Sequence, residues 1–184
     1  TAAARVAEES VTLLRNRKNL VPLRLEPGAK VLFLKSEHMP DHRIANADRF
    51  AGFYEAFEAF GAEIVVDDFL RFKTYQDCLE QFAYVILMEH VTTTNTGGSI
   101  RAQGPVWAFM SHPYDRKILI SFGTPYYLHD VASADTYVNG YCDSAVTQAA
   151  VAKALFGVIP FTGTSPVNCA YEFQRGDGIR TAVE

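Results

Sequence analysis

The chain has 184 residues and a formal net charge of −4, and 48% of its residues are hydrophobic, which suits one domain with a sizeable core. An acidic balance argues against nucleic-acid partners and anionic membranes, because both favour basic surfaces. The longest apolar run, Phe82–Met88, is far shorter than the roughly 18 residues that span a bilayer.

The predicted elements begin with a helix at 2–15, because its apolar side chains recur at helical spacing. The stretch 16–29 contains two prolines and a glycine, which favour an irregular linker. Continuous apolar runs, and segments rich in residues that favour strands, predict strands at 30–35, 63–68, 83–89, 117–122 and 135–141. Helical periodicity predicts helices at 50–60, 75–82, 105–112 and 144–156.

Strands that alternate with helices and are apolar throughout indicate an α/β fold. We predict a three-layer sandwich in which a mainly parallel sheet of about five to six strands is flanked by helices. The whole chain, 1–184, is expected to form one domain, with an entry helix and linker (1–29), an α/β core (30–157) and an irregular tail (158–184). Ligands of such sheets bind beyond the carboxyl ends of the strands, so a site is expected in the loops there.

The loop after the third predicted strand carries the most suggestive polar residues. Glu89, His90 and Arg101 follow an apolar strand, and a carboxylate beside an imidazole can serve general acid–base chemistry. The simpler interpretation is that a strand becomes polar where it meets water. Glu89 and His90 are therefore weak catalytic candidates, and Arg101 is a candidate for substrate contact in a cleft.

Aromatic residues supply a second cleft candidate. Trp107 and the pair Tyr126 and Tyr127 could stack on sugars, although interior packing is the simpler interpretation. Tyr126 is taken as the candidate because it ends the turn Gly-Thr-Pro-Tyr after the fourth predicted strand. In that turn Gly123 lets the chain reverse and Pro125 presets φ for a helix start, so a structural role is predicted.

Neither a metal site nor a cofactor site is predicted. His38 and His42 lie in the segment EHMPDH, but Pro40 breaks any helical pairing and no HExxH motif occurs. Gly97 and Gly98 stand outside the phosphate motifs GxGxxG and GxxxxGK[ST], so a flexible loop is the better interpretation. The three cysteines fit no paired metal or redox motif: Cys78, Cys142 and Cys169.

Two stretches together resemble the C-terminal α/β sandwich domain of glycoside hydrolase family 3. The first, AARVAEESVTLLRNRKNLVPL at 3–23, is similar to the segment with which that domain begins. The second, at 118–167, is similar to its last portion, with an apolar strand, a Pro-Tyr turn and an alanine-rich helix ending in Leu-Phe-Gly. The residues that match that ending are Gln148, Ala149, Ala152, Leu155, Phe156, Gly157, Gly163, Pro166 and Val167. FQRGDGI at 173–179 is similar to the tail of many family members.

The resemblance implies a parent enzyme in which a (β/α)8 catalytic barrel precedes this domain and carries the nucleophilic aspartate. In the β-N-acetylhexosaminidase branch the barrel also holds the acid/base His–Asp pair, and the short loops of this chain favour that branch. In the β-glucosidase branch this domain donates the acid/base glutamate, for which Glu89 is the candidate by position. The expected function is thus that of a non-catalytic domain supporting a barrel that hydrolyses β-linked N-acetylglucosaminides.

The resemblance also implies the partners. The chain alone is expected to be inactive and to pack on the upstream barrel of the same polypeptide, meeting carbohydrate only indirectly. No cofactor, metal, nucleic acid or membrane is expected. The sequence does not determine the cellular compartment. One expectation is a bacterial parent enzyme that is secreted or belongs to the cell envelope. A stand-alone flavodoxin-like domain that binds a small molecule is the alternative outside this family.

Overall fold

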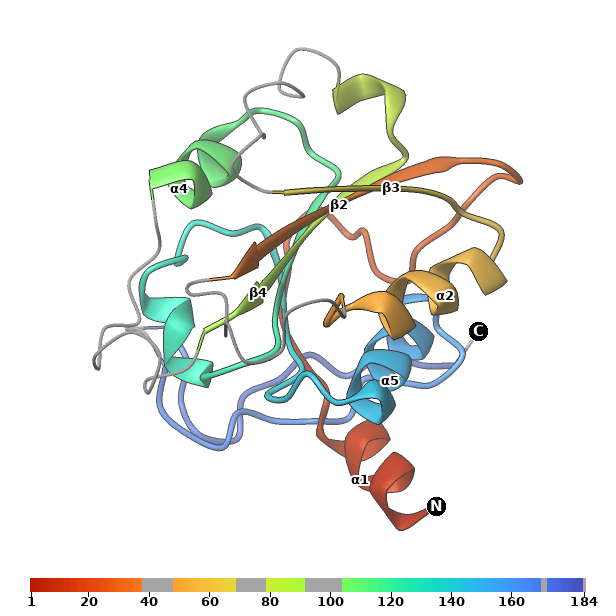
Figure 1. Ribbon diagram of the computed structural model, residues 1–184. Helices are drawn as coiled ribbons and strands as arrows, with labels where there is room; N and C mark the ends of the chain where they lie inside the picture. The colour runs from red at the N-terminus through yellow and green to blue at the C-terminus, as the bar shows by residue number, and fades with distance from the viewer. Residues whose placement is uncertain (38–47, 69–78, 92–103, 170–171, 184) are drawn as a thin grey trace.

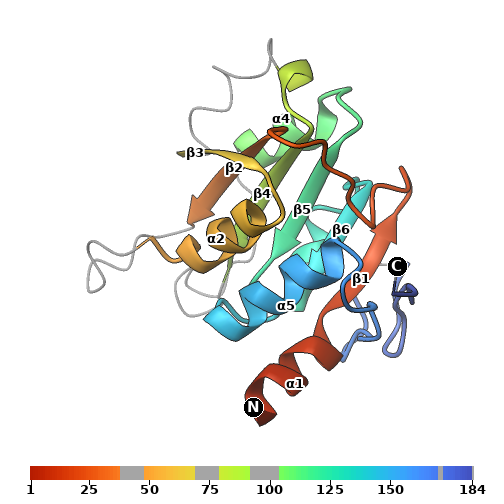
Figure 2. The ribbon, with the colours of Figure 1, turned by 90° about the vertical axis from the view of Figure 1, so that its right-hand side faces the viewer.

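One sheet organises the chain (Figure 1), and its six strands have the order β1-β6-β5-β4-β2-β3 (Figure 2). The computed structural model describes residues 1–37, 48–68, 79–91, 104–169 and 172–183. The strands are β1 (Thr12–Asn16), β2 (Lys30–Glu37), β3 (Glu63–Asp68), β4 (Tyr84–His90), β5 (Lys117–Ser121) and β6 (Thr136–Asn139). The helices are α1 (Ala2–Ser10), α2 (Ala51–Ala59), α4 (Gly104–Ser111) and α5 (Ala145–Leu155), with short 3-10 helices η3 (Leu79–Gln81) and η4 (Pro125–His129). All neighbouring strands are parallel except β1 and β6, so the predicted mainly parallel α/β sandwich is confirmed.

The sheet is buried on both faces by different elements. On one, here the helical face, α2 and α5 lie against the strands and α1 packs beside α5 (Figure 2). There Phe33 of β2 makes edge contacts with Phe53 and Phe57 of α2, at centroid distances of 5.7 and 5.0 Å. The other face, the tail face, is covered by α4, η4 and residues of the C-terminal tail. Burial on both faces explains why the strands read as continuous apolar runs.

The first strand corrects the predicted helix at 2–15. Helix α1 ends at Ser10, whose hydroxyl donates to the Ala7 carbonyl, and Val11 turns into extended backbone. Residues 12–15 are all buried, because β1 pairs antiparallel with β6. The β-branched pair Val11 and Thr12 suits this pairing, and tertiary contacts outweigh the helical spacing of the sequence.

The C-terminal tail closes the outer edge of β1. The Ile179 amide donates to the Leu13 carbonyl at 2.8 Å, forming an isolated antiparallel bridge. Gly163 lies against the junction of α1 and β1, where an added Cβ would stand 2.3 Å from the Ser10 carbonyl oxygen. A side chain cannot fit there, so glycine lets the tail seal an edge that would otherwise expose unpaired backbone groups.

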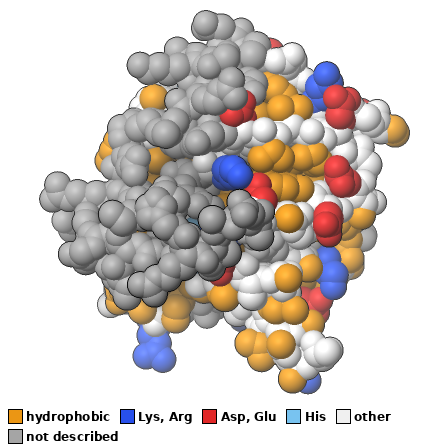
Figure 3. Space-filling view, viewed as in Figure 1, with side chains coloured by type: hydrophobic (Ala, Val, Ile, Leu, Met, Phe, Trp, Pro, Cys, Tyr) orange, Lys and Arg blue, Asp and Glu red, His pale blue; other side chains and the backbone are white. Residues whose placement is uncertain are grey.

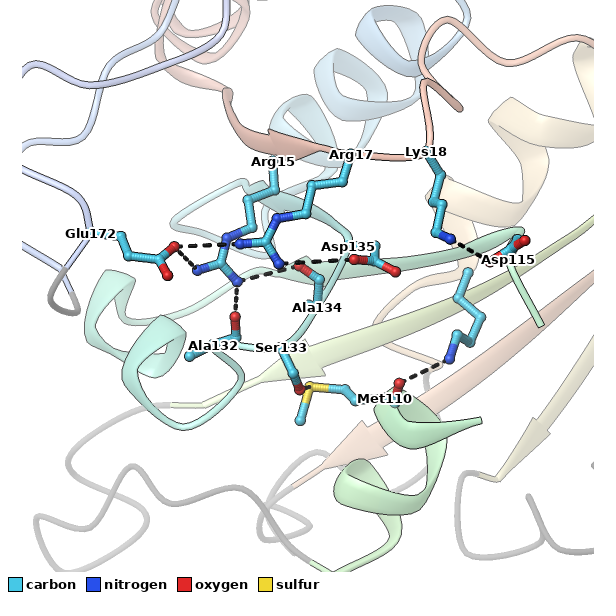
Figure 4. Close-up of polar contacts among 11 residues, drawn as sticks. Arg15, Arg17, Lys18, Met110, Asp115, Ala132, Ser133, Ala134, Asp135 and Glu172 are labelled. Carbon is cyan, nitrogen blue, oxygen red and sulfur yellow. Dashed lines mark hydrogen bonds and ion pairs between the residues drawn. The ribbon is translucent and has the colours of Figure 1, made fainter. Parts of the chain in front are cut away.

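Arg15 of β1 joins three parts of the chain (Figure 4). Its side chain is only 3% exposed and forms an ion pair with Glu172 of the tail at 2.8 Å. It also donates to the Ala132 and Ala134 carbonyls, which precede β6. Burial lowers the pKa of Arg15, because a poorly hydrated position disfavours the charged guanidinium.

Like Arg15, Lys117 at the start of β5 donates to main-chain carbonyls of another segment. Its ammonium group donates to the Phe109, Met110 and His112 carbonyls at the end of α4. Carbonyls at the C-terminal end of a helix lack N–H donors from a following turn, and a lysine can supply donors there. Burial lowers the pKa of Lys117 to about 8.

None of the helices in the described part of the chain has the length and apolar character of a membrane span.

Candidate functional site

The carboxyl ends of β2 to β6 meet at one edge of the sheet, because these five strands are parallel. Strand β2 lies between β3 and β4. The chain continues from β2 to β3 in one direction and from β4 to β5 in the other, so the strand order reverses between β2 and β4. Such a switch point is where open α/β sheets bind ligands. Glu89 and His90 end β4 directly beside it, as the sequence predicts for the loop after this strand.

Glu89 and His90 do not share a site, because successive strand residues face opposite sides of a sheet. Glu89 alternates with Leu87, which belongs to the core of the tail face. His90 alternates with Met88, which belongs to the core of the helical face. The carboxylate and the imidazole therefore cannot act together on one group at this edge.

Glu89 is fully buried, at 0% exposure. Its carboxyl group lies by the hydroxyl of Tyr127 from η4, and that residue is also 0% exposed. Burial raises the pKa of Tyr127, and the nearby Glu89 charge raises it further. The Glu89 side chain therefore lies inside the domain and does not meet solvent.

His90 belongs to a polar cluster on the helical face, which we call the edge cluster: Arg49, His90, Asp143 and Gln148. Asp143 accepts from the Arg49 guanidinium at 2.5 Å, and the same oxygen lies 3.6 Å from His90 Nδ1. The buried Gln148 amide of α5 donates to the main-chain carbonyls of Arg49 and Asp143, both at 2.7 Å. The cluster thus ties the start of α2, the end of β4 and the loop before α5 into one unit.

The edge cluster retains access to solvent. The side chains of Arg49, His90 and Asp143 are 20%, 14% and 28% exposed. An imidazole near a carboxylate can bind a hydroxyl group or move a proton. His90 thus stands near Asp143 with access to solvent, whereas a catalytic role of Glu89 would require its burial to be relieved.

The ion pair between Asp143 and Arg49 should be measurable in stability. Replacing Asp143 with alanine leaves a half-buried guanidinium without this carboxylate and is expected to cost about 1–2 kcal/mol. Urea denaturation of both forms would test this. Asp115→Ala is the control, because Asp115 pairs with Lys18 at 2.7 Å on the open surface. Equal losses in the two variants would contradict a special role for the edge cluster.

The other candidates are separate from the edge cluster. Tyr126 is the second residue of η4 and is 44% exposed, and Trp107 of α4 is 48% exposed, so interior packing is the wrong interpretation for both. Tyr127 is buried, as that interpretation predicts. Arg101 lies outside the described residues, as do the loop histidines His38 and His42.

The turn at Gly123 is structural, as predicted. The Thr124 amide donates to the Val91 carbonyl at 2.9 Å, so the turn after β5 is fastened to the chain just beyond β4. Thr124 caps η4, and Pro125 takes its first position. The Cys169 thiol of the tail donates to the Pro125 carbonyl at 3.3 Å, which fixes the turn from the other side.

Two members of the edge cluster were missed from the sequence. Arg49 and Asp143 are 94 residues apart, and only the strand order brings them together. Asp143 immediately precedes Ser144, whose side chain caps α5 by accepting from the Thr147 amide. The described residues contain no group of three or more His, Cys, Asp or Glu side chains suited to a metal.

Comparison with known proteins adds sequence and fold relatives. A β-N-acetylglucosaminidase/β-glucosidase from Cellulomonas fimi is 26% identical over 188 aligned positions, covering 90% of this chain and 31% of that protein. A β-glucoside phosphorylase structure superposes with a TM-score of 0.70 at 22% identity, covering 90% of this chain and 31% of that one. A family 3 β-N-acetylglucosaminidase from Paenibacillus sp. gives a TM-score of 0.65 at 18% identity, covering 88% and 31%. No family model matches the chain. The chain therefore spans about a third of the length of the relatives it matches.

Proposed function

Because the chain corresponds in sequence and fold to the C-terminal part of a family 3 glycoside hydrolase, we propose that it is the non-catalytic second domain of such an enzyme. It would pack on a (β/α)8 barrel of the same polypeptide and border the substrate cleft with its carboxyl edge. The reaction of the whole enzyme would be hydrolysis of β-linked N-acetylglucosaminides.

The observation that carries this proposal is the placement of the acidic groups. A retaining glycosidase uses two carboxyl groups about 5–5.5 Å apart across the scissile bond. Glu89 is buried on the tail face, and Asp143 is engaged by Arg49 on the helical face. Since they lie on opposite sides of the sheet, these two groups cannot flank one glycosidic bond, which supports a nucleophile supplied by another domain.

The surface also suits a domain that packs on another. Helix α1 projects from the body of the domain, and only Ala7 of its side chains is buried (Figure 1). Val6 on this helix is 66% exposed. In the view of Figure 3 the described Lys and Arg side chains are scattered, which is unlike the basic face of a nucleic-acid interface.

A second candidate is that Glu89 is the acid/base of a β-glucosidase-type site. Its position at the end of β4, by the switch point, favours this candidate. In that case η4 or the tail would have to move in the parent enzyme to bring the carboxyl group to the substrate.

One experiment distinguishes the two candidate functions. Hydrolysis of 4-nitrophenyl N-acetyl-β-glucosaminide and 4-nitrophenyl β-glucoside would be followed with this chain alone and with the parent enzyme. We expect the chain alone to be inert and Glu89→Gln to change the kcat of the parent less than about threefold. A fall of about 100-fold or more, the usual contribution of a general acid, would support Glu89 as acid/base instead. Turnover by the chain alone would refute both.

A further inference from the structure

A row of polar side chains crosses the tail face beneath Glu89. Glu89 of β4 is the register neighbour of Ser121 of β5, and Ser121 is the neighbour of Asn139 of β6. Tyr137 precedes Asn139 by two residues and so faces the same side. Adjacent strands are about 4.8 Å apart, so these groups lie near one another on one face of the sheet.

Three of these side chains are buried without a hydrogen bond of ordinary geometry. Ser121, Tyr137 and Asn139 are each 0% exposed. Within the described chain, no hydrogen bond of ordinary geometry reaches the Ser121 hydroxyl, the Tyr137 hydroxyl or either polar atom of the Asn139 side chain. Tyr137 lies beside Ser121, and the Tyr141 hydroxyl lies beside Asn139. Burial raises the pKa of Tyr137, while the nearby Ser121 hydroxyl acts in the opposite direction. The hydroxyl groups therefore lie close to each other in a poorly hydrated site.

Such a group of atoms is costly to leave unsatisfied. Each unpaired buried donor or acceptor costs roughly 1–3 kcal/mol, and buried polar atoms in folded proteins are almost always bonded to protein or water. Four such atoms lie here on two adjacent strands. Ordered buried water commonly makes about three hydrogen bonds, a number that a hydroxyl pair and an amide can supply.

We propose that Ser121, Tyr137 and Asn139 form an internal site for ordered water, which also solvates the Glu89 carboxyl group. The ligand is water because η4 and the tail cover the tail face. A larger molecule could reach these fully buried side chains only by displacing them. The inference concerns the stability of this chain and stands whether or not the parent enzyme is a glycosidase.

The sign of one stability change tests the proposal. If water satisfies the Ser121 hydroxyl, Ser121→Ala removes a bonded group, and the unfolding equilibrium constant should rise about fivefold. Tyr137→Phe should act in the same direction. If the hydroxyl groups are unsatisfied, their removal relieves a penalty, and an unchanged or lower unfolding constant would overturn the proposal.

A matched control calibrates the change. Ser165 is also buried, at 1% exposure, and its hydroxyl donates to the Val167 carbonyl at 2.7 Å. Ser165→Ala therefore reports the loss of a buried serine bonded to protein, and Ser121→Ala should resemble it. A crystal structure of the unaltered chain at about 1.2 Å resolution decides whether the partner of these groups is water or a neighbouring side chain, and it serves also where a variant does not fold. Density within about 3.2 Å of the Ser121 hydroxyl and the Asn139 amide is expected, and an empty space would overturn the proposal.

Discussion

Replacing Gly123 with alanine is expected to destabilise the chain by about 3 kcal/mol, near the upper end for overpacking. The added Cβ would stand 2.1 Å from the Val91 carbonyl oxygen and 2.8 Å from its carbonyl carbon. Both are backbone atoms, which cannot rotate away as the end of a side chain can. Either the turn moves or the bond from the Thr124 amide to the same carbonyl breaks. Urea denaturation would measure the loss.

Gly52→Ala is the matched control for this prediction. Gly52 lies in α2, and its added Cβ would meet only the Gln148 side chain, at the ordinary contact distance of 3.5 Å. Because alanine is the better helix former, this variant should be as stable as the original or slightly more so. Equal destabilisation by the two substitutions would show that the clash at Val91 is not the cause.

Arg15→Met is expected to cost about 3 kcal/mol, because it removes the donors that serve buried carbonyls. Methionine fills much of the same volume but cannot donate to the Ala132 and Ala134 carbonyls. It also releases Glu172 and removes the guanidinium from over the Phe173 ring, 5.1 Å away. The tail should loosen as well, which faster proteolysis of the residues after 169 would reveal.

Arg17→Met is the control for Arg15→Met, because it removes a charge near Glu172 without removing buried hydrogen bonds. Arg17 also pairs with Glu172, at 3.5 Å, but its side chain is 49% exposed (Figure 4). Exposed ion pairs contribute little, so a loss below about 1 kcal/mol is expected. If Arg17→Met proved as damaging as Arg15→Met, the net charge near Glu172 would matter more than the buried hydrogen bonds.

The parallel core could be predicted from sequence because its strands are buried on both faces. Runs such as Tyr84–His90 are apolar at nearly every position, and helices between them leave few alternatives. Strand β1 could not be found this way. Ala3, Ala7, Val11 and Leu14 recur at helical spacing, but the burial of residues 12–15 depends on partners more than 100 residues away.

The candidate site shows the same limit. The sequence correctly places Glu89 and His90 at a strand end, since polarity changes there. Strand alternation places them on opposite sides, but the sequence could not show which core each side joins. It also could not join Arg49 to Asp143, since no local pattern encodes the strand order that brings their loops together.

The pairing of β1 with β6 has a consequence for synthesis on the ribosome. Thr12 is made early, but its partner Asn139 follows roughly 120 residues later. At about 5–20 residues per second, β1 waits roughly 6–25 s before it can join the sheet. The bridge to Ile179 forms later still. This edge of the nascent domain therefore stays open to chaperones and to mispairing until almost the whole domain has left the exit tunnel.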